Sequence, residues 1–328
     1  MPERTTVTEL VQIGVESTAG TAVAATKQLT SLGLVGSPKM NFDKFRPAGS
    51  KFNTLTAMGK EWTEAKITGE PCYTELQYLL SSVLQYTAPV VIGATTAYTW
   101  ANLPSSTGPD TVKTYTVEKG SSVRAEKWAY GIVSDLTLSG DRDNIDLSGM
   151  MMGRAMSEGI TMTSSGVTSP ALIPILPQEV SIYADDTSGA LGTTKLLRVL
   201  KWSWSISGRF NPLWVVDAAQ TSWVAHVEGP VTAQLKLTLE NDAIGAAYRT
   251  IARTSATKFI RIEAVSSQLA GTAQPYKLTF DSAAKVSETG EASDEDGIQA
   301  YELTFDIVHD ATWGKALTAS LINTASAL

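Results

Sequence analysis

Apolar and polar residues alternate along much of the chain, and this period of two predicts that β-strands are its main elements. Residues 234–240 alternate strictly, with leucine at every second position. Residues 196–206 place Trp202, Trp204 and Ile206 on one face, with lysine and serine on the other. A strand with one buried face and one solvated face produces this pattern. Further strands are expected at residues 64–69, 114–118, 128–138, 145–152, 180–183, 258–264, 276–280 and 298–308.

Two segments instead place apolar residues three and four positions apart, which predicts one helix in each half of the chain. The first helix is expected at residues 74–85, with Thr74 as its N-cap. The second is expected at residues 242–254, with Asn241 or Asp242 as its N-cap. Both are short, which suits a helix that flanks a β-rich module.

The order of the expected elements recurs in the second half of the chain. Each half shows a strand, a long loop, a strand, a short helix and then three strands, with little residue identity. This recurrence predicts a mainly β protein of two β-sandwich or barrel modules, each with one flanking α-helix, duplicated in tandem. Residues 157–169 are rich in Ser, Thr and Gly and are followed by prolines, as is typical of a linker. The expected organisation is an N-terminal arm (1–30), a first module (31–160), a linker (161–178) and a second module (179–328).

The N-terminal arm is expected to lack a core of its own. Residues 16–22 are small and polar, so they have little apolar surface to bury. We therefore expect the arm to become ordered only against a neighbouring subunit.

The composition of the 328 residues narrows the choice of partner and compartment. The formal net charge is −7 and no run of Lys and Arg occurs, so duplex nucleic acid is not an expected direct ligand. Cys72 is the single cysteine, which fits a reducing compartment. The N-terminus is not of the signal-peptide type, and no apolar stretch approaches the length of a membrane helix. We therefore expect no membrane partner.

Residue patterns that carry chemistry are scarce in this sequence. It has no phosphate-binding glycine loop, and its two histidines, His226 and His309, have no Cys or His companions. Asp185 with Asp186, and residues 294–296, could hold a divalent cation, but neither has the spaced ligands of a calcium loop, and solvated turns are the favoured interpretation. The sequence therefore predicts a protein that is not an enzyme, with no catalytic residues, no cofactor and no metal ligands.

Two stretches of the sequence resemble a known family of virion proteins. Residues 10–22 carry a G-x-E-x-x-x-G-T pattern, formed here by Gly14, Glu16, Gly20 and Thr21. This opening and the order of the elements are similar to those of the tail tube (major tail) proteins of long-tailed, non-contractile bacteriophages, the siphophages. Residues 185–206 resemble the same family. The resemblance spans most of the chain, and its motifs carry no catalytic chemistry.

The resemblance implies a structural role in the virion. In that family a β-sandwich with a flanking helix joins its sheets across subunits into a ring with an inner β-barrel, and rings of six modules stack into a hollow tube. A duplicated chain would need three copies per ring, which is favoured over six copies with the second half outside the barrel. Expected partners are further copies of the chain, the tape-measure protein, and the tail-terminator and tail-tip proteins, while DNA passes through the lumen without specific binding. The expected location is the tail of the virion, after assembly in the cytoplasm of the host bacterium.

The resemblance also indicates which residues to expect at contacts and in the lumen. In the family a long loop between two early strands reaches the adjacent ring, and the corresponding loops here are residues 42–61 and 210–221. An acidic lumen would repel phosphate and let DNA slide. The contact candidates are Phe42, Phe45, Phe52, Trp62, Phe210 and Trp214, and the acidic lumen candidates are Asp135, Asp141, Asp143 and Asp146.

Two other interpretations are open at the level of the sequence. A β-sandwich that decorates a virion or binds a carbohydrate receptor would use Trp202 and Trp204 as a platform for a sugar ring. An enzyme of unrecognised type would need a pocket of convergent polar groups.

Overall fold

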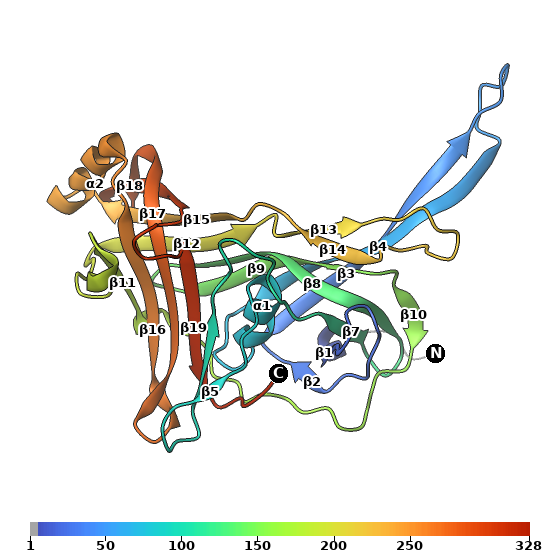
Figure 1. The fold of residues 1–328 in the computed structure, drawn as a ribbon, viewed down its shortest axis with the longest axis horizontal. Coiled ribbons are helices and arrows are strands. Elements are labelled where there is room, and N and C mark those ends of the chain that lie inside the picture. Colours follow the sequence, from blue (N-terminus) through green and yellow to red (C-terminus); the bar gives the residue numbers. More distant parts are fainter. Residues whose placement is uncertain (1–5) are drawn as a thin grey trace.

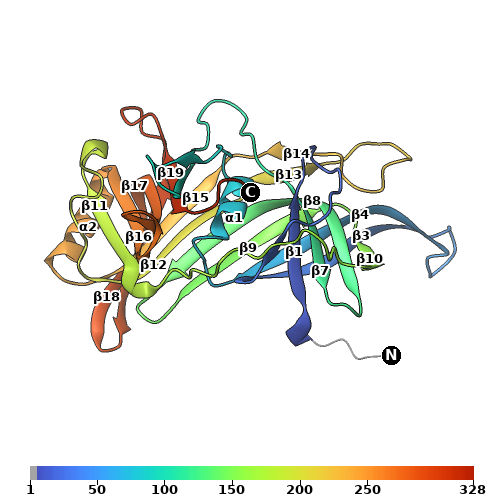
Figure 2. The same cartoon turned by 90° about the horizontal axis from the view of Figure 1, so that it is seen from below.

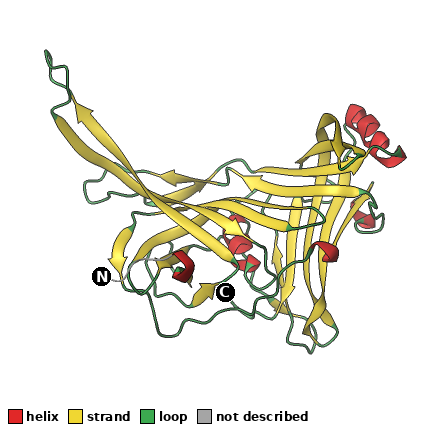
Figure 3. Ribbon diagram, turned by 180° about the vertical axis from the view of Figure 1, so that it is seen from behind, coloured by secondary structure: helices red, strands yellow, loops and turns green. Residues whose placement is uncertain are grey.

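Antiparallel β-strands make up most of the computed structural model, which describes residues 6–328 (Figure 1 and Figure 3). The prediction of a mainly β protein is confirmed. The elements of the first half are η1 (Thr6–Thr8), β1 (Leu10–Val15), β2 (Lys27–Leu29), β3 (Leu32–Phe45), β4 (Leu55–Gly69), α1 (Leu76–Val83), β5 (Val90–Val91), β6 (Tyr98–Asn102), β7 (Tyr115–Gly120), β8 (Ala125–Gly140), β9 (Ile145–Gly153) and β10 (Ser157–Ile160).

The second half follows after a long irregular segment and contains the other α-helix. Its elements are η2 (Pro177–Glu179), β11 (Val180–Asp185), η3 (Ser188–Ala190), β12 (Val199–Ser207), β13 (Phe210–Leu213), β14 (Ala225–Glu228), β15 (Thr232–Glu240), α2 (Ala243–Thr254), β16 (Lys258–Gly271), β17 (Gln274–Glu295), β18 (Ile298–Ile307) and β19 (Leu317–Asn323).

A principal sheet runs without interruption through both halves of the chain. Its strands follow the order β3-β4-β9-β8-β12-β15-β18-β17, and every neighbouring pair is antiparallel. The halves meet where β8 pairs with β12, with Leu138 opposite Trp204, and Figure 2 shows these strands side by side. Leu138, Trp204 and Leu235 face the core and are buried, whereas Ser139 and Ser203 lie on the opposite, polar face because side chains alternate along a strand.

Strands β8 and β17 are long enough to take part in two layers. The N-terminal part of β8 pairs with β7 and β10, and its C-terminal part pairs with β9 and β12. In the same way, β17 pairs with β16 and β19 before it reaches β18. A register shift marks each strand, between Val133 and Asp135 in β8 and between Val286 and Glu288 in β17. Such bulges bend a strand and increase its twist, which lets one strand pass between layers.

Corresponding strands have the same neighbours in the two halves. The order is β1-β7-β8-β9-β4-β3 in the first half and β11-β16-β17-β18-β15-β12 in the second. One α-helix follows β4 in the chain, and the other follows β15. The same connectivity therefore occurs twice in the chain.

Both helices lie close to their predicted positions, but only one of the predicted caps is present. Every residue of α1 is buried, and Glu75 holds its N-cap position. Thr74 does not cap α1, because its hydroxyl donates to the Ala171 carbonyl instead. The α2 helix begins after Asp242, whose carboxylate accepts a hydrogen bond from the Ile244 amide, as expected for an N-cap.

The N-terminal segment belongs to the first half and is not the separate arm that its composition predicted. Strand β1 pairs with β2 and β7, and Val11 and Ile13 are buried in the main core. The small polar stretch after β1 is ordered within the chain by Glu16, as described below. The part of the expected arm at residues 1–5 lies outside the described residues.

The two expected long loops are largely β-hairpins. Strands β3 and β4 stay paired as far as Phe45 and Leu55, and residues 40–60, here called the projecting hairpin, extend away from the body of the molecule (Figure 1). Between β12 and β15 the chain forms the shorter hairpin β13–β14. That hairpin lies against the first half, where the Trp223 indole N–H donates to the Gly153 carbonyl.

One apolar core extends across both halves. Trp204 of β12 stacks on Phe280 of β17, with ring centroids 4.4 Å apart. The segment at residues 161–176 carries no helix or strand and runs along the first half, where the Tyr73 amide donates to the Ile173 carbonyl. The two halves therefore share a sheet and a core.

Candidate functional site

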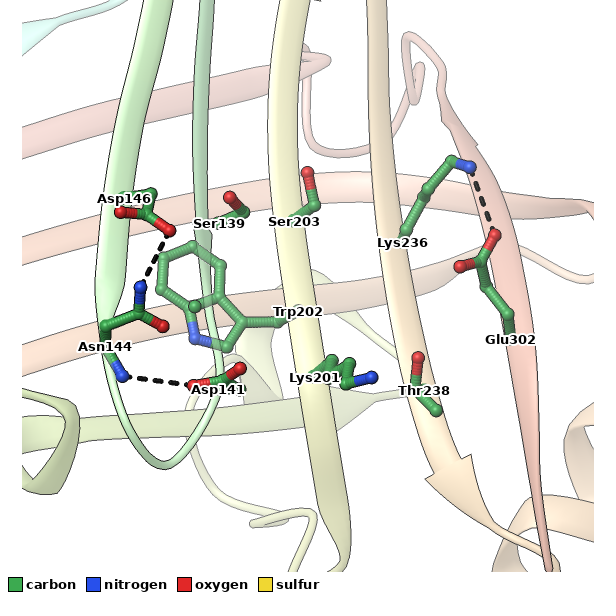
Figure 4. Close-up of a pocket in the computed structure, with 11 residues that line it drawn as sticks. Ser139, Asp141, Asn144, Asp146, Lys201, Trp202, Ser203, Lys236, Thr238 and Glu302 are labelled. Carbon is green, nitrogen blue, oxygen red and sulfur yellow. Dashed lines mark hydrogen bonds and ion pairs between the residues drawn. The ribbon is translucent and has the colours of Figure 1, made fainter. Parts of the chain in front are cut away.

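The polar face of the principal sheet is the strongest candidate for a functional surface. At the seam between the halves, Ser139 lies opposite Ser203 and Thr137 lies opposite Ser205. Ser139 and Ser203 line a shallow depression of about 250 Å³ at this seam (Figure 4). The charged residues that line the depression are Asp141, Asp146, Lys201, Lys236 and Glu302.

Lysines at the seam are paired with carboxylates of neighbouring strands. Lys236 Nζ lies 3.1 Å from Glu302 Oε1, as Figure 4 shows, and Lys201 Nζ lies 2.6 Å from Glu295 Oε2. Exposed pairs of this kind contribute only about 0.2–1 kcal/mol to stability. Their effect on the local field is more important, because each ammonium group is balanced by a carboxylate. At the seam the face therefore presents hydroxyl groups and balanced charge.

Three of the predicted lumen residues gather at the turn between β8 and β9. Asp146 is exposed on the polar face and accepts a hydrogen bond from the Asn144 side chain. Asp141 accepts hydrogen bonds from the amides of Asn144 and Asp143, and these bonds hold the pKa of Asp141 below its ordinary value. Asp143 is exposed within the turn. The turn thus brings three carboxylates to one end of the polar face.

The fourth predicted lumen residue, Asp135, is engaged in a contact between the halves. It lies in the bulge of β8, where its carboxylate accepts a hydrogen bond from the Gly208 amide at 3.0 Å. The neighbouring Ser134 carbonyl accepts a hydrogen bond from the Arg209 amide at 3.2 Å. Asp135 therefore helps to fix the chain between β12 and β13 on the first half.

Three of the aromatic contact candidates are exposed on the projecting hairpin. The exposed fractions are 45% for Phe42, 61% for Phe45 and 79% for Phe52. Exposed apolar side chains gathered on one segment are typical of protein–protein interaction surfaces, so these three residues stay candidates for such a contact.

The other three aromatic candidates lie where the two hairpins meet. Trp62 and Trp214 are half-buried and pack edge to face, with ring centroids 5.8 Å apart. Phe210 is only 3% exposed and packs in a cluster with Tyr130 and Trp223. The prediction that Phe210 contacts another subunit is wrong for this reason, since its side chain is used inside the chain.

The glycine and threonine pattern after β1 has a structural explanation. Glu16 is buried, and its carboxylate accepts hydrogen bonds from the Gly20 amide and the Thr114 hydroxyl. Asp185 lies at the end of β11 and accepts hydrogen bonds from the amides of residues 192–194. In each half, a buried carboxylate at the end of the first long strand thus organises the loop that follows.

Replacing Asp185 with asparagine is expected to lower the free energy of unfolding at pH 7 by about 1–3 kcal/mol, because charge-assisted hydrogen bonds are lost. Burial alone would raise the pKa of Asp185, but hydrogen bonds from Thr194 and Thr193 outweigh burial and hold that pKa below its ordinary value. The contribution of Asp185 is therefore present above about pH 4, the range of an unfolded aspartate, and is lost as pH falls through the lowered pKa.

Urea unfolding of the wild type and of Asp185→Asn at a series of pH values measures this effect. Asp186→Asn is the matched control, because the neighbouring Asp186 side chain is 82% exposed. A stability difference between wild type and Asp185→Asn that persists unchanged in strong acid would contradict the assignment.

The sequence did not single out the residues that join the halves. Arg209 is buried, and its partners Asp110 and Glu228 lie 99 and 19 residues away, so no local pattern marks them. The bulges left a weak signal, because Val-Ser-Asp at residues 133–135 recurs as Val-Ser-Glu at residues 286–288.

The acidic clusters that were considered as cation sites have protein partners. Asp186 pairs with Lys258, and Asp294 accepts a hydrogen bond from the Gly297 amide in a turn. Within residues 6–328, no group of three or more His, Cys, Asp or Glu side chains could hold a metal ion.

The proposed sugar platform is absent from the surface. Trp202 lines the depression but is only 8% exposed, and Trp204 is fully buried, so neither presents an open ring face to a ligand. No helix in the described part of the chain is long and apolar enough to cross a membrane.

Comparisons with known proteins do not place this chain in a family. No protein-family model matches it, and no curated protein is significantly similar to it in sequence. Its function is therefore inferred from its own sequence and structure.

Proposed function

We propose that this chain is a structural protein of the tail-tube kind, whose copies join edge to edge into a ring with the polar face of the sheet lining a channel. One observation carries the proposal. The principal sheet ends in two open edges, β3 and β17, and the internal seam between β8 and β12 has the pairing that these edges would repeat between copies.

The two open edges have opposite charge. Residues 287–295 of β17 pair with β18 alone, and β3 pairs with β4 alone, within residues 6–328. Unpaired edges recruit further strands, so a soluble protein must cover or blunt them. The β17 edge carries exposed Glu288 and Glu291, whereas the β3 strand carries Lys44 with Asp43 beside it, and Lys39, which pairs with Glu64 of β4. Opposite charge favours β17 of one copy beside β3 of the next over the pairing of like edges.

The shared connectivity of the two halves supports the same arrangement. In that connectivity β17 corresponds to β8, and β3 corresponds to β12. We attribute the shared connectivity to tandem duplication. The pairing of β8 with β12 inside the chain would then be repeated by β17 of one copy with β3 of the next. The two helices differ in burial, as expected if a neighbouring copy covers the second half. The α1 helix of the first half is entirely buried, whereas only Gly245 and Tyr248 are buried in α2.

The polar face suits a channel for a polyanion. At the seam, hydroxyl groups and lysines balanced by carboxylates offer phosphate no array of unpaired cations, and counterion release from such an array is what drives DNA binding. In this proposal DNA passes without specific binding, the tape-measure protein occupies the channel during assembly, and the protein resides in the tail of a virion.

We expect the purified protein at high concentration to form closed rings of three chains, because two modules per chain give six modules in a ring. Negative-stain images and the native mass of trapped rings measure this. Rings of six chains with one half outside would contradict the role given to the duplication. A protein that stays monomeric and binds a glycan saturably would instead favour a receptor-binding module.

A further inference from the structure

We propose that the bulge in β17 is the docking point for the projecting hairpin of the next copy, an inference that rests on the proposed ring. This bulge, Val286 to Glu288, repeats the one at residues 133–135 of β8. In both, the serine hydroxyl lies 3.3 Å from a carbonyl of the paired strand, Ser134 from Met150 and Ser287 from Thr304. The Ser134 hydroxyl also donates to the Asp135 carboxylate at 2.6 Å. The two bulges therefore share their register and the contact between the serine and the paired strand.

The β8 bulge already holds a segment of the other half. The Asp135 carboxylate accepts a hydrogen bond from the Gly208 amide, and the Ser134 carbonyl accepts one from the Arg209 amide. Phe210 follows these two amides directly and is 3% exposed. The β8 bulge thus fixes the chain that follows β12, and Phe210 beyond it is buried.

The β17 bulge presents the equivalent carboxylate without a donor. Ser287 and Glu288 are exposed, and no group within residues 6–328 donates a hydrogen bond to the Glu288 carboxylate. Glu288 takes the place of Asp135, so a carboxylate stands where an incoming amide would arrive.

The amide that fits this bulge lies at the base of the projecting hairpin. Leu34 of β3 corresponds to Trp202 of β12. Leu34 stands opposite Ile67 of β4, and Trp202 stands opposite Leu237 of β15. The register of β4 with β9 matches that of β15 with β18, so these positions correspond. Counting on from these positions, Met40 and Asn41 correspond to residues 208–209. Met40 of the next copy would therefore donate to Glu288. Asn41 has no such role, because its amide points to the opposite side of β3 from the Met40 amide, whereas Gly208 has a left-handed φ of 65° and lies outside β12.

The Met40 amide faces the open side of β3. Residues two apart in a strand direct their amide nitrogens to the same side, so Met40 shares its side with Pro38. A proline is tolerated in a strand only where no ladder partner needs its N–H. The Met40 amide therefore points away from β4, and a strand that pairs with β3 on this side would lack one ladder hydrogen bond at Pro38.

Docking would also explain the exposure of Phe42. Phe42 stands opposite Met58 in its hairpin, just as Phe210 stands opposite Glu228 in the hairpin β13–β14. Phe42 is 45% exposed where Phe210 is 3% exposed, because the surface that corresponds to the first half belongs to another copy. Contact with the second half of that copy would cover it.

Glu288→Ala tests the carboxylate. We expect the dissociation constant of the ring to rise roughly tenfold to a hundredfold, the range of a lost hydrogen bond to a charged group. The unfolding midpoint of the monomer should stay unchanged, because Glu288 has no partner there. Glu70→Ala is the matched control, since Glu70 is exposed and follows β4 at the end opposite the projecting hairpin. Phe42→Ser should likewise weaken association without changing the stability of the monomer.

A pair of cysteines tests the register itself. Ile206 stands opposite Leu136 in the internal seam, and the corresponding positions across copies are Pro38 and Thr289. Opposed residues bring their Cβ atoms close enough for a disulfide. The double variant Pro38→Cys/Thr289→Cys should give covalent products that end at three chains under mild oxidation. A mixture of the two single variants should give linked dimers and nothing larger.

The outcomes separate this inference from the proposed function. Wild-type rings that form while Glu288→Ala associates normally and the cysteines stay unlinked would overturn the docking and leave the ring. A wild-type protein that forms no ring at any concentration would overturn both.

Discussion

Replacing Trp204 with alanine is expected to lower the free energy of unfolding by about 3–5 kcal/mol, the range for a large aromatic side chain removed from a core. Trp204 is fully buried and stacks on Phe280 with ring centroids 4.4 Å apart. It also stands between Leu138 of β8 and Leu235 of β15, so its loss opens the seam between the halves. Strands of both halves should therefore lose protection together.

Denaturant unfolding gives the size of the Trp204 effect, and hydrogen exchange measured by peptide shows where it acts. Trp214→Ala is the control of the same chemistry, because Trp214 is half-buried and packs mainly on Trp62. Trp214→Ala should lower the free energy of unfolding much less than Trp204→Ala. If the first half kept its protection in Trp204→Ala while the second half lost it, the halves would be independent domains despite the shared sheet.

The strands of the core could be predicted from the sequence because their two faces differ in chemistry. β12 places tryptophans on one face and serines on the other, and β15 places leucines opposite lysine and threonine. The paired strands of the projecting hairpin gave no such signal, because both of its faces are exposed and no core imposes alternation.

The partners of strands and loops could not be predicted from local patterns. The small polar stretch after β1 resembles a disordered segment in composition, yet one buried carboxylate, Glu16, organises it. Phe210 and Phe42 both lie in hairpins that were expected to be long loops, and only the fold decides that one is buried and the other exposed. The polar and apolar faces of single strands could be predicted from the sequence. The pairing of β8 with β12 could not, because it depends on residues that are far apart in the chain.

A buried ion pair joins the halves at the end of α1. Arg209 donates to the Val83 carbonyl at the C-terminal end of that helix at 3.1 Å, and to Glu228 Oε2 at 3.3 Å. It also pairs with Asp110, and the side chains of Arg209 and Asp110 are only 2% and 1% exposed. A cation at a helix C-terminus is favourable, and burial makes both charges depend on each other.

Arg209→Met is therefore expected to lower the free energy of unfolding by about 3–5 kcal/mol, because it leaves the Asp110 carboxylate buried without its cation. The double variant Arg209→Met/Asp110→Ala should be more stable than the sum of the two single changes predicts, since it removes the uncompensated charge.

Arg124→Met is the matched control. Arg124 pairs with Glu158 at side-chain exposures of 51% and 53%, so its loss should cost no more than about 1 kcal/mol. Urea unfolding of the four variants and the wild type, at low and high salt, measures these differences. Salt should leave the Arg209 effect nearly unchanged because water and ions are excluded from the pair. Equal costs for Arg209→Met and Arg124→Met would show that the buried pair does not hold the halves together.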